Sequence, residues 1–516
     1  MGETSYRFAP HPSSGLLLGL RLAQLLGFIL AGALALGALH LGGLGGLTLA
    51  LGALALAAGI LLVPVRGQTI EQWTPLVVRF LFARFGGRAR FRSQRAQLGH
   101  VVALPSGELD PQRPGEPSSF PAELADLEFL EGELVRYENA RFGVAKDARA
   151  RTFTAALRVR GRAFALLGAA ERERRLADYG AVLAALARDD SAVRRIAWVE
   201  RTLPGDGDAL GDHLLQAKRP DATLEQPPEE LVSYLQLIGR AGDVAEEHEL
   251  SFAIQVDSRR PAARRAITRM GGGDLGALAV LASEVGQLVE LLDRAGIGVT
   301  GILTRRGLAG AIRDAYDPWG RRSRQRQLDR SLPIDGGVAA HTAGPFARSE
   351  AWSHLATDGA LHCTLWAAEW PRIDVRALFL QPLLMDSAAT RTIAMCMELV
   401  GPSRAIRQAE RAATETATEQ SLRARVGQRT SERQVQRDRA SKERERELAE
   451  GHAAVRYAAY VTVSVPSWGR DARSELESDV SRVELEAKRA PLRLERMWGQ
   501  QAEAFTYGLP LCRGLR

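Results

Sequence analysis

The lysines are the first residues to test for chemistry, because a P-loop needs one. In that motif a lysine directly follows a glycine and reaches the β- and γ-phosphates of a nucleotide, while glycine amides hold the phosphates. The chain has four lysines and none of them follows a glycine: Lys146, Lys218, Lys442 and Lys488. We therefore exclude a Walker-type ATPase.

Two turns have compositions typical of ligand-binding loops. The GGGD segment at 271–274 precedes an apolar helical pattern, but it lacks the G-x-G-x-x-G spacing and a strand before it, so we expect a loop that ends with Asp274 as an N-cap. Asp206, Asp208 and Asp212 lack the register and the final glutamate of a calcium loop. A polar turn is the better interpretation of these aspartates.

Histidines and cysteines do not form a plausible catalytic or metal-binding set. His362 and Cys363 are adjacent in a strand pattern, so their side chains point to opposite faces. Cys363, Cys396 and Cys512 are far apart without a C-x-x-C pair, and we expect small buried residues in a reducing compartment. We identify no catalytic, cofactor-binding or metal-binding residue and expect a protein that is not an enzyme. A membrane-tethered enzyme with an unrecognised site is the least favoured alternative.

The basic character of the chain comes almost entirely from arginine. The net charge is +7, and of 68 basic residues 68 − 4 = 64 are arginines. This bias, together with much Ala, Gly and Leu, is typical of a GC-rich genome, whereas nucleic-acid recognition gathers basic residues on one face. We do not expect direct nucleic-acid binding, although anionic lipid headgroups remain suitable partners.

Two uncharged apolar segments lie near the N-terminus. Residues 22–39 and 44–65 each have about the 20 residues needed to cross a bilayer as a helix, and only four residues separate them. The sequence therefore predicts a transmembrane two-helix hairpin at 22–65, a multi-pass anchor in the lipid bilayer of the inner (cytoplasmic) membrane.

Arginines flank these segments and are absent between them, which predicts that both termini are cytoplasmic. A cleaved signal peptide with a site near Ala31–Ala33 is the alternative. Residues 69–85 have apolar side chains at helical spacing, and this helix either lies on the inner leaflet or packs against the soluble domain. The expected membrane-interface residues are Arg66, Trp73, Arg79, Arg84, Arg88, Arg90 and Arg92.

Beyond this region the chain alternates between strand and helix patterns. We expect strands at 152–159, 195–203, 250–256, 299–303, 361–366, 392–400, 454–465 and 492–497, and helices at 171–188, 229–247, 275–294, 375–384 and 472–489. This order predicts an α+β fold of duplicated ferredoxin-like units. The expected domains are a cytoplasmic tail at 1–21, the hairpin at 22–65, the amphipathic helix and a linker at 66–121, and α+β domains at 122–330 and 331–516.

Residues 402–449 differ from the rest of the second domain. They are rich in Arg, Glu, Gln and Ala and have few large apolar residues, so we expect a long, solvent-exposed, charged helical arm. Interleaved acids make a nucleic-acid-binding arm the weaker alternative.

Several short segments, taken together, resemble a known family. They include the hairpin and its Arg/Trp-rich helix, the Phe142-Gly143-Val144 strand, and the following residues: Tyr316, Asp317, Pro318, Trp352, Trp366, Gln500, Phe505 and Pro510. With them the chain resembles actinobacterial integral-membrane proteins of type IV secretion (conjugation) clusters. In these, a PrgI-type two-helix hairpin is fused to a domain similar to the N-terminal, non-motor domain of VirB/Tra conjugative ATPases.

The resemblance implies a structural adaptor without cofactors. Such a protein would seat a separately encoded secretion ATPase at the inner membrane beside other channel components, and the matched residues would be structural. A type VII secretion component of the EccE kind is the alternative, since it also pairs two N-terminal spans with a cytoplasmic domain. Self-association into a homo-oligomer is left open.

Overall fold

The computed structural model describes most of the 516 residues. The described ranges are 22–62, 69–93, 120–134, 140–161, 164–204, 246–321, 337–385, 389–411 and 453–515, together with Phe8 and the isolated residues 229, 232, 233, 236, 324, 414 and 446.

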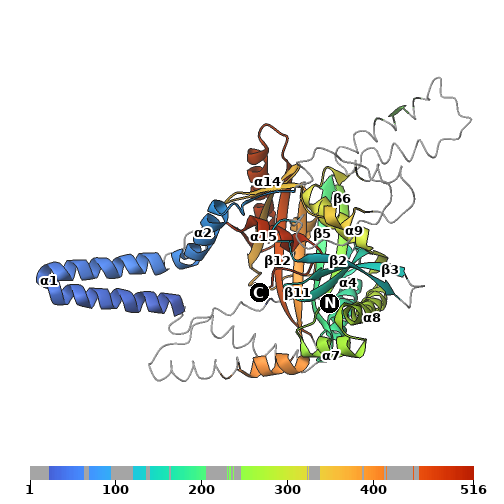
Figure 1. The fold of residues 1–516 in the computed structure, drawn as a ribbon, viewed down its shortest axis with the longest axis horizontal. Helices are drawn as coiled ribbons and strands as arrows, with labels where there is room; N and C mark the ends of the chain where they lie inside the picture. The colour runs from blue at the N-terminus through green and yellow to red at the C-terminus, as the bar shows by residue number, and fades with distance from the viewer. Residues whose placement is uncertain are drawn as a thin grey trace, which may run out of the picture.

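A single sheet of 13 strands forms the centre of the protein (Figure 1). Its main path runs β1-β8-β9-β10-β12-β11-β5-β6-β4-β3-β2, with β13 added to β10 and β7 to β4, and every pair is antiparallel. The strands are β1 (Arg90–Arg92), β2 (Leu127–Leu134), β3 (Ala140–Asp147), β4 (Thr152–Arg160), β5 (Val193–Pro204), β6 (Glu246–Asp257), β7 (Gly298–Ile302), β8 (Ala347–Glu350), β9 (Leu355–Ala356), β10 (Ala360–Glu369), β11 (Arg391–Val400), β12 (Ala454–Pro466) and β13 (Arg493–Arg496).

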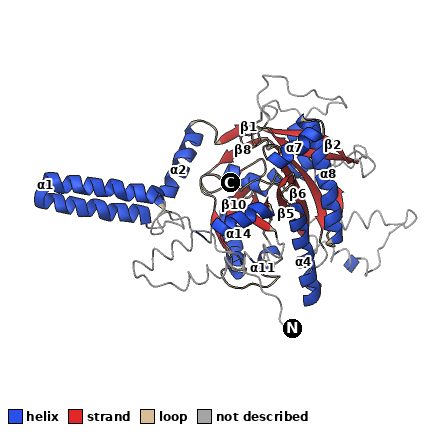
Figure 2. Ribbon diagram, turned by 90° about the horizontal axis from the view of Figure 1, so that it is seen from below, coloured by secondary structure: helices blue, strands red, loops and turns tan. Residues whose placement is uncertain are grey.

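Helices and the C-terminal segment cover the two faces of this sheet. One face packs against α4, α7, α8, α11 and α14 (Figure 2). The other packs against α9, α15 and the segment that ends at Leu515. The helices are α1 (Leu22–Leu62), α2 (Ile70–Phe85), α4 (Ala169–Leu186), α7 (Pro261–Arg269), α8 (Gly273–Arg294), α9 (Arg305–Tyr316), α11 (Gln381–Leu384), α14 (Ala472–Arg489) and α15 (Gln501–Phe505), with short 3-10 turns η1 (Phe164–Leu166), η2 (Ala340–Thr342) and η3 (Thr506–Gly508).

The same order of elements occurs twice within the sheet. The first half runs β4-α4-β5-β6-α7-α8-β7 and the second runs β10-α11-β11-β12-α14-β13. In each half the third strand lies between the first two, and the last strand returns to pair with the first. The halves join where β5 pairs with β11, for example Ala197 opposite Cys396.

The structure contradicts the expected fold class, beginning with the transmembrane hairpin. Within the described residues, the helix that is long and apolar enough to cross a membrane is α8, at Gly273–Arg294, and nearly half of it is buried. Its Leu281, Leu288 and Leu292 pack in the core beside the sheet, so α8 is a core helix. The apolar stretches of α1, Gln24–His40 and Gly46–Gly59, are 10–17 residues long, which is short of a span. Two membrane-spanning helices are therefore not found in the part of the chain that the structure describes.

The expected arrangement of ferredoxin-like units as the body of the protein is also wrong, because the strands of both regions hydrogen-bond into one continuous 13-stranded sheet. The predicted strands match β4, β5, β6, β7, β10, β11, β12 and β13, and three predicted helices match α4, α8 and α14. The helix expected at 375–384 is reduced to the single turn of α11. Most of the helix expected at 229–247 lies outside the described residues, and its end belongs to β6.

Several other predictions have mixed outcomes. Asp274 is not an N-cap, because α8 is capped by Gly272, and 271–273 all have positive φ that glycine tolerates. All three cysteines are buried and free, as expected. Most of the 402–449 arm, most of the 106–121 linker and the aspartates at 206–212 lie outside the described residues.

Candidate functional site

Helix α2 presents two different faces. Phe80 is buried against the body, and Trp73 is half-buried on the same side. The ring of Trp352 lies 5.9 Å from that of Trp73 and 5.0 Å from that of Phe80, in an edge contact with the latter. The side chains of Arg79 and Glu503 form an ion pair between α2 and α15. One face of α2 is therefore fixed to the body.

Trp352 is held in turn by the segment before α15. The amide of Gly499 donates to the carbonyl of Trp352 at 2.8 Å, and φ at Gly499 is +65°. A Cβ at that position would lie 2.4 Å from the Trp352 ring. Glycine is therefore required here both for the backbone angle and for the close approach.

The opposite face of α2 is apolar and exposed. Its exposed fractions run from 38% to 84%, for Val77, Val78, Leu81, Phe82 and Phe85. These residues are spaced by three and four positions and so form one stripe along the helix. We call them the α2 stripe. The structure thus confirms that this helix packs against the body, and contact of its exposed apolar face with the inner leaflet stays a prediction.

Four of the predicted membrane-interface arginines are exposed on α2 or shortly after it in the sequence. Arg84 and Arg88 are exposed on α2 and the turn after it, and Arg90 and Arg92 are exposed on β1, which pairs with β8. Arg66 lies outside the described residues.

The family-motif residues are brought together in part. Tyr316 and Phe505 are both buried, with ring centres 4.5 Å apart, and Phe505 also lies 4.7 Å from the ring of His362. Thr357 donates to the carbonyl of Tyr316 at 2.7 Å. This cluster fixes the end of α9 and α15 against β10.

The remaining motif residues have local structural roles. Asp317 accepts from the amide of Gly320 at 3.0 Å and pairs with Arg324 at 2.5 Å. Pro318 and Pro510 are buried, in the turn after α9 and after η3 respectively, and Trp366 is half-buried on β10. Gln500 is the N-cap of α15.

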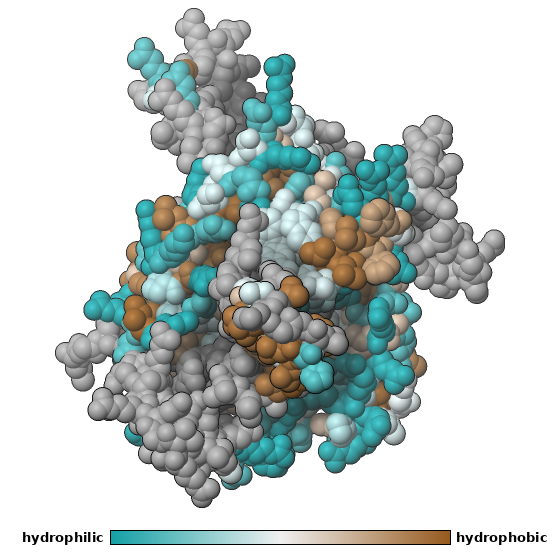
Figure 3. Space-filling model, turned by 90° about the vertical axis from the view of Figure 1, so that its left-hand side faces the viewer, coloured by the Kyte–Doolittle hydropathy of each residue, from teal (hydrophilic) through white to brown (hydrophobic). Residues whose placement is uncertain are grey.

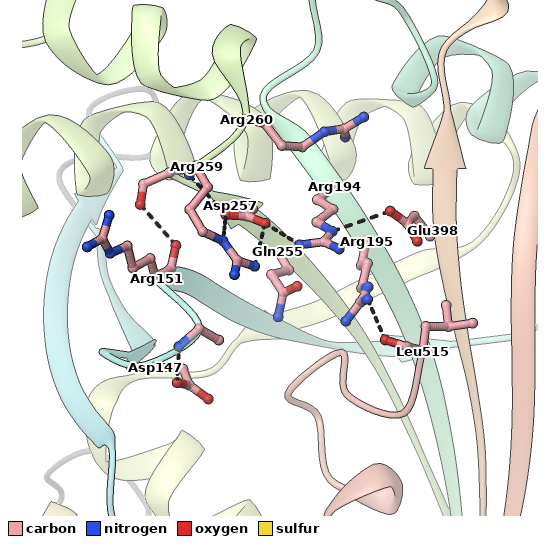
Figure 4. Close-up of polar contacts among 12 residues, drawn as sticks. Asp147, Arg151, Arg194, Arg195, Gln255, Asp257, Arg259, Arg260, Glu398 and Leu515 are labelled. Atoms are coloured by element: carbon pink, nitrogen blue, oxygen red, sulfur yellow. Dashed lines mark hydrogen bonds and ion pairs between the residues drawn. The ribbon is translucent and has the colours of Figure 1, made fainter. Parts of the chain in front are cut away.

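A second region, which the sequence did not predict, is a polar cavity of about 220 Å³ between the sheet and the C-terminal segment. Four arginines from three parts of the chain line it: Arg194, Arg195, Arg259 and Arg513. Figure 4 shows the first three of them. The other lining side chains come from Leu127, Ala145, Asp147, Ala150, Thr152, Thr154, Gln255, Leu511, Cys512 and Leu515. We call this the arginine cavity.

A β-bulge places two of these arginines side by side. The register of β5 on β6 shifts between Val193, opposite Val256, and Arg195, opposite Gln255, so Arg194 is the extra residue. Alternation along a regular strand would send neighbouring side chains to opposite faces. The bulge is what allows both Arg194 and Arg195 to line one cavity.

Carboxylates compensate part of the charge. Asp257 is almost fully buried and accepts two hydrogen bonds from the guanidinium of Arg259 at 3.0 Å, and it also pairs with Arg194. Burial opposes ionisation, but these hydrogen bonds hold the pKa of Asp257 below its ordinary value. Glu398 pairs with Arg194 at 3.4 Å.

Arg513 pairs with a different carboxylate, that of Asp147, at 2.7 Å.

Arg195 differs from the other three arginines. It donates from Nη2 to the carbonyl of Leu515 at 2.5 Å, and its buried Nε has no partner among the described residues. Gln255 donates from Nε2 to Thr154 Oγ1 at 3.2 Å and to the carbonyl of Leu511 at 3.1 Å, while its buried Oε1 has no partner there. Two side chains that line the cavity thus each keep one buried polar atom without a partner among the described residues.

Backbone strain is found at the same place. Cys512 has φ +52°, a conformation that non-glycine residues rarely adopt and that tends to persist at functional sites. Burial raises the pKa of the Cys512 thiol well above its ordinary value, so this residue is an inert wall of the cavity.

A weak signal for this cavity was present in the sequence. Gln255 interrupts the apolar run at 252–256, and buried amides need partners. Arg194 and Arg195 were concealed by the high arginine content of the whole chain.

No family model matches the chain, and no curated protein matches it.

Proposed function

We propose that this chain is a membrane-attached structural adaptor of a type IV secretion (conjugation) apparatus, and that it holds a separately encoded ATPase at the cytoplasmic face of the inner membrane. The resemblance of the sequence motivates the apparatus. The observation that carries the attachment is the two-faced helix α2, fixed to the body on one side and apolar on the other.

Helix α1 supports attachment to lipid in particular. It contains no charged residue, and leucines on different sides of it, such as Leu30, Leu34, Leu36 and Leu49, are 62–69% exposed. A helix that is apolar all round favours an apolar surrounding phase over a single protein groove. In Figure 1, α1 projects away from the sheet, and apolar side chains gather near the middle of the view in Figure 3, with hydrophilic ones around them.

The charges beside the α2 stripe favour an anionic membrane surface. Arg84, Arg88, Arg90 and Arg92 are exposed next to the apolar residues. Each arginine near an anionic leaflet contributes about 1 kcal/mol of attraction. Lipid would therefore be contacted by apolar side chains and by guanidinium groups together.

The coupling of α2 to the body gives the adaptor its mechanical role. A force on the membrane-facing helices would pass through Trp352 and the Arg79–Glu503 pair to α15, which hydrogen-bonds to β10 through Gln501. A partner seated on the body would thus be held at a fixed distance from the membrane.

Cell fractionation tests the attachment. The full chain should sediment with membranes and resist a high-salt wash. A Leu30→Glu/Leu34→Glu variant should move to the soluble fraction, because charges in an apolar phase are costly. Leu166→Glu is the matched control, since Leu166 is 86% exposed on η1 and should leave the chain in the membrane fraction. A wild-type chain found in the soluble fraction would contradict the attachment.

Gene deletion tests the apparatus. DNA transfer from the deleted cell should fail, and the wild-type gene should restore it. Trp352→Ala should leave the protein in the membrane fraction but reduce transfer, because α2 would be uncoupled from the body. If transfer continues in the deleted cell, the proposed function is wrong.

A further inference from the structure

The arginine cavity carries more positive charge than its carboxylates neutralise. Its wall contains four guanidinium groups and, among the described residues, one carboxylate, Asp147. Asp257 and Glu398 lie outside the lining and bind Arg194, and Asp257 also binds Arg259. Counting described residues alone, four cations stand against three anions. Glu398 is further shared with Arg456 at 3.5 Å.

Arg260 lies beside these groups. Its pKa is lowered chiefly by burial; the charges of Glu398 and Asp257 oppose that shift, and those of Arg194 and Arg404 add to it. Buried charges in proteins are normally paired. An anion in the cavity would supply the missing pair.

The unpartnered polar atoms of Gln255 and Arg195 also indicate which hydrogen bonds a ligand would make. The orientation of the Gln255 amide is fixed, because the carbonyl of Leu511 can only accept and so must face the NH₂ group. Oε1 therefore requires a donor from the ligand. Arg195 instead supplies hydrogen-bond donors, and guanidinium donors suit the oxygens of phosphate. In Figure 4 the Gln255 side chain lies between the guanidinium groups of Arg259 and Arg195.

The size of the cavity limits the ligand to a compact group. Its volume of about 220 Å³ is below the range of about 300–1,000 Å³ that is usual for drug-sized ligands. The side chain of Arg259 is 50% exposed, so the cavity can be reached from solvent.

We propose that the arginine cavity binds a protonated tetrahedral oxyanion, inorganic phosphate or the phosphate end of a small phosphorylated molecule, with Arg195 donating to the oxyanion and Gln255 Oε1 accepting from its P–OH group or an adjacent hydroxyl. This binding does not depend on the proposed attachment to a membrane.

Calorimetric titration of the full chain in detergent, at low ionic strength, tests the proposal. Inorganic phosphate should bind, and it should raise the unfolding temperature in proportion to its concentration. Sulfate has the same shape but no proton at neutral pH, and we expect it to bind at least tenfold more weakly. Glycerol 3-phosphate and glycerol, used as further probes, distinguish a phosphorylated small molecule from a neutral polyol.

Three variants sharpen the test. Arg195→Met should weaken phosphate binding at least tenfold, as expected for the loss of a charged hydrogen bond. Gln255→Leu should remove the preference for phosphate over sulfate. Arg158→Met is the matched control, since Arg158 lies on β4 outside the lining, and it should bind phosphate as the wild type does.

Three results would overturn the proposal: a wild-type chain that neither binds phosphate nor gains thermal stability from it, equal affinity for phosphate and sulfate, or unchanged affinity in Arg195→Met. Because the wild-type titration and its thermal shift need no variant, a variant that fails to fold does not remove the test.

Discussion

The two halves of the sheet repeat the same topology but treat their buried polar groups differently. In the first half Thr154 lies directly opposite Gln255, and in the second half Thr364 lies opposite Thr462. Thr364 and Thr462 share a hydrogen bond of 2.9 Å, whereas Gln255 keeps a buried oxygen without a partner among the described residues. A buried polar group that is fully bonded stabilises a fold, while one left unused is available to a ligand.

Two other buried polar side chains of the second half are also hydrogen-bonded. His362 hydrogen-bonds to Ser464 at 2.8 Å and to Thr357 at 2.9 Å. Gln501 Oε1 accepts from the amide of Thr364 at 2.8 Å, and its Nε2 donates to the carbonyl of Met497 at 2.8 Å. The C-terminal segment thus hydrogen-bonds to buried polar groups of the second half. Over the first half, by contrast, it borders the arginine cavity.

Substitution of Gln501, in the second half, should have the largest effect on stability. Gln501→Leu leaves the amide of Thr364 and the carbonyl of Met497 buried without partners, and we expect a loss of about 3 kcal/mol in the free energy of unfolding. Gln255→Leu is the matched change in the first half and should cost at most about 1 kcal/mol, because it also removes an oxygen that is already unpaired. Urea unfolding measures both; equal losses would contradict the contrast between the halves.

Acid should destabilise the protein through His362, in the second half of the sheet. Burial lowers the pKa of His362 from its ordinary 6.5 to about 3. Between these values the unfolded chain takes up a proton that the native state does not, so stability falls as pH drops below 6.5 and this contribution stops changing near pH 3. We expect a loss of about 2 kcal/mol from pH 7 to pH 5.

The difference between wild type and His362→Gln isolates this residue from the other histidines. The variant should be less stable at pH 7 but lose about 2 kcal/mol less between pH 7 and pH 5, as followed by urea unfolding at each pH. Parallel pH profiles for the two proteins would show that His362 is not the group that titrates.

Local patterns in the sequence were sufficient to predict most strands but not their arrangement. The apolar pattern at 250–256 marks β6, yet nothing local indicates that β5 pairs with β11, where Ala197 faces Cys396 across two hundred residues of chain. That pairing merges the expected units into one sheet. The helical spacing at 69–85 revealed the apolar positions of α2, while which of them face Trp352 depends on a residue far along the chain.

The candidate sites also differ in how far the sequence predicts them. Phe505 and Tyr316 were selected as structural residues through the resemblance to a family, and both are buried in the structure. The arginine cavity could not, since it depends on a β-bulge at Arg194 and on the path of the C-terminal segment, and neither has a periodic signature.

The smallest effect on stability is expected at the cavity itself. Arg195 makes one hydrogen bond to the carbonyl of Leu515 and no ion pair with a described carboxylate. In phosphate-free buffer, Arg195→Met should therefore change the free energy of unfolding by no more than about 1 kcal/mol, because the lost hydrogen bond is offset by relief of like-charge repulsion. Arg194→Met is the matched contrast: it removes a partner from both Asp257 and Glu398 and should cost about 2 kcal/mol. Added phosphate should then stabilise the wild type and leave Arg195→Met unchanged. Arg195 is a structural residue if, without phosphate, Arg195→Met lowers the free energy of unfolding as much as Arg194→Met does. The polar groups of the first half would then serve stability, as those of the second half do.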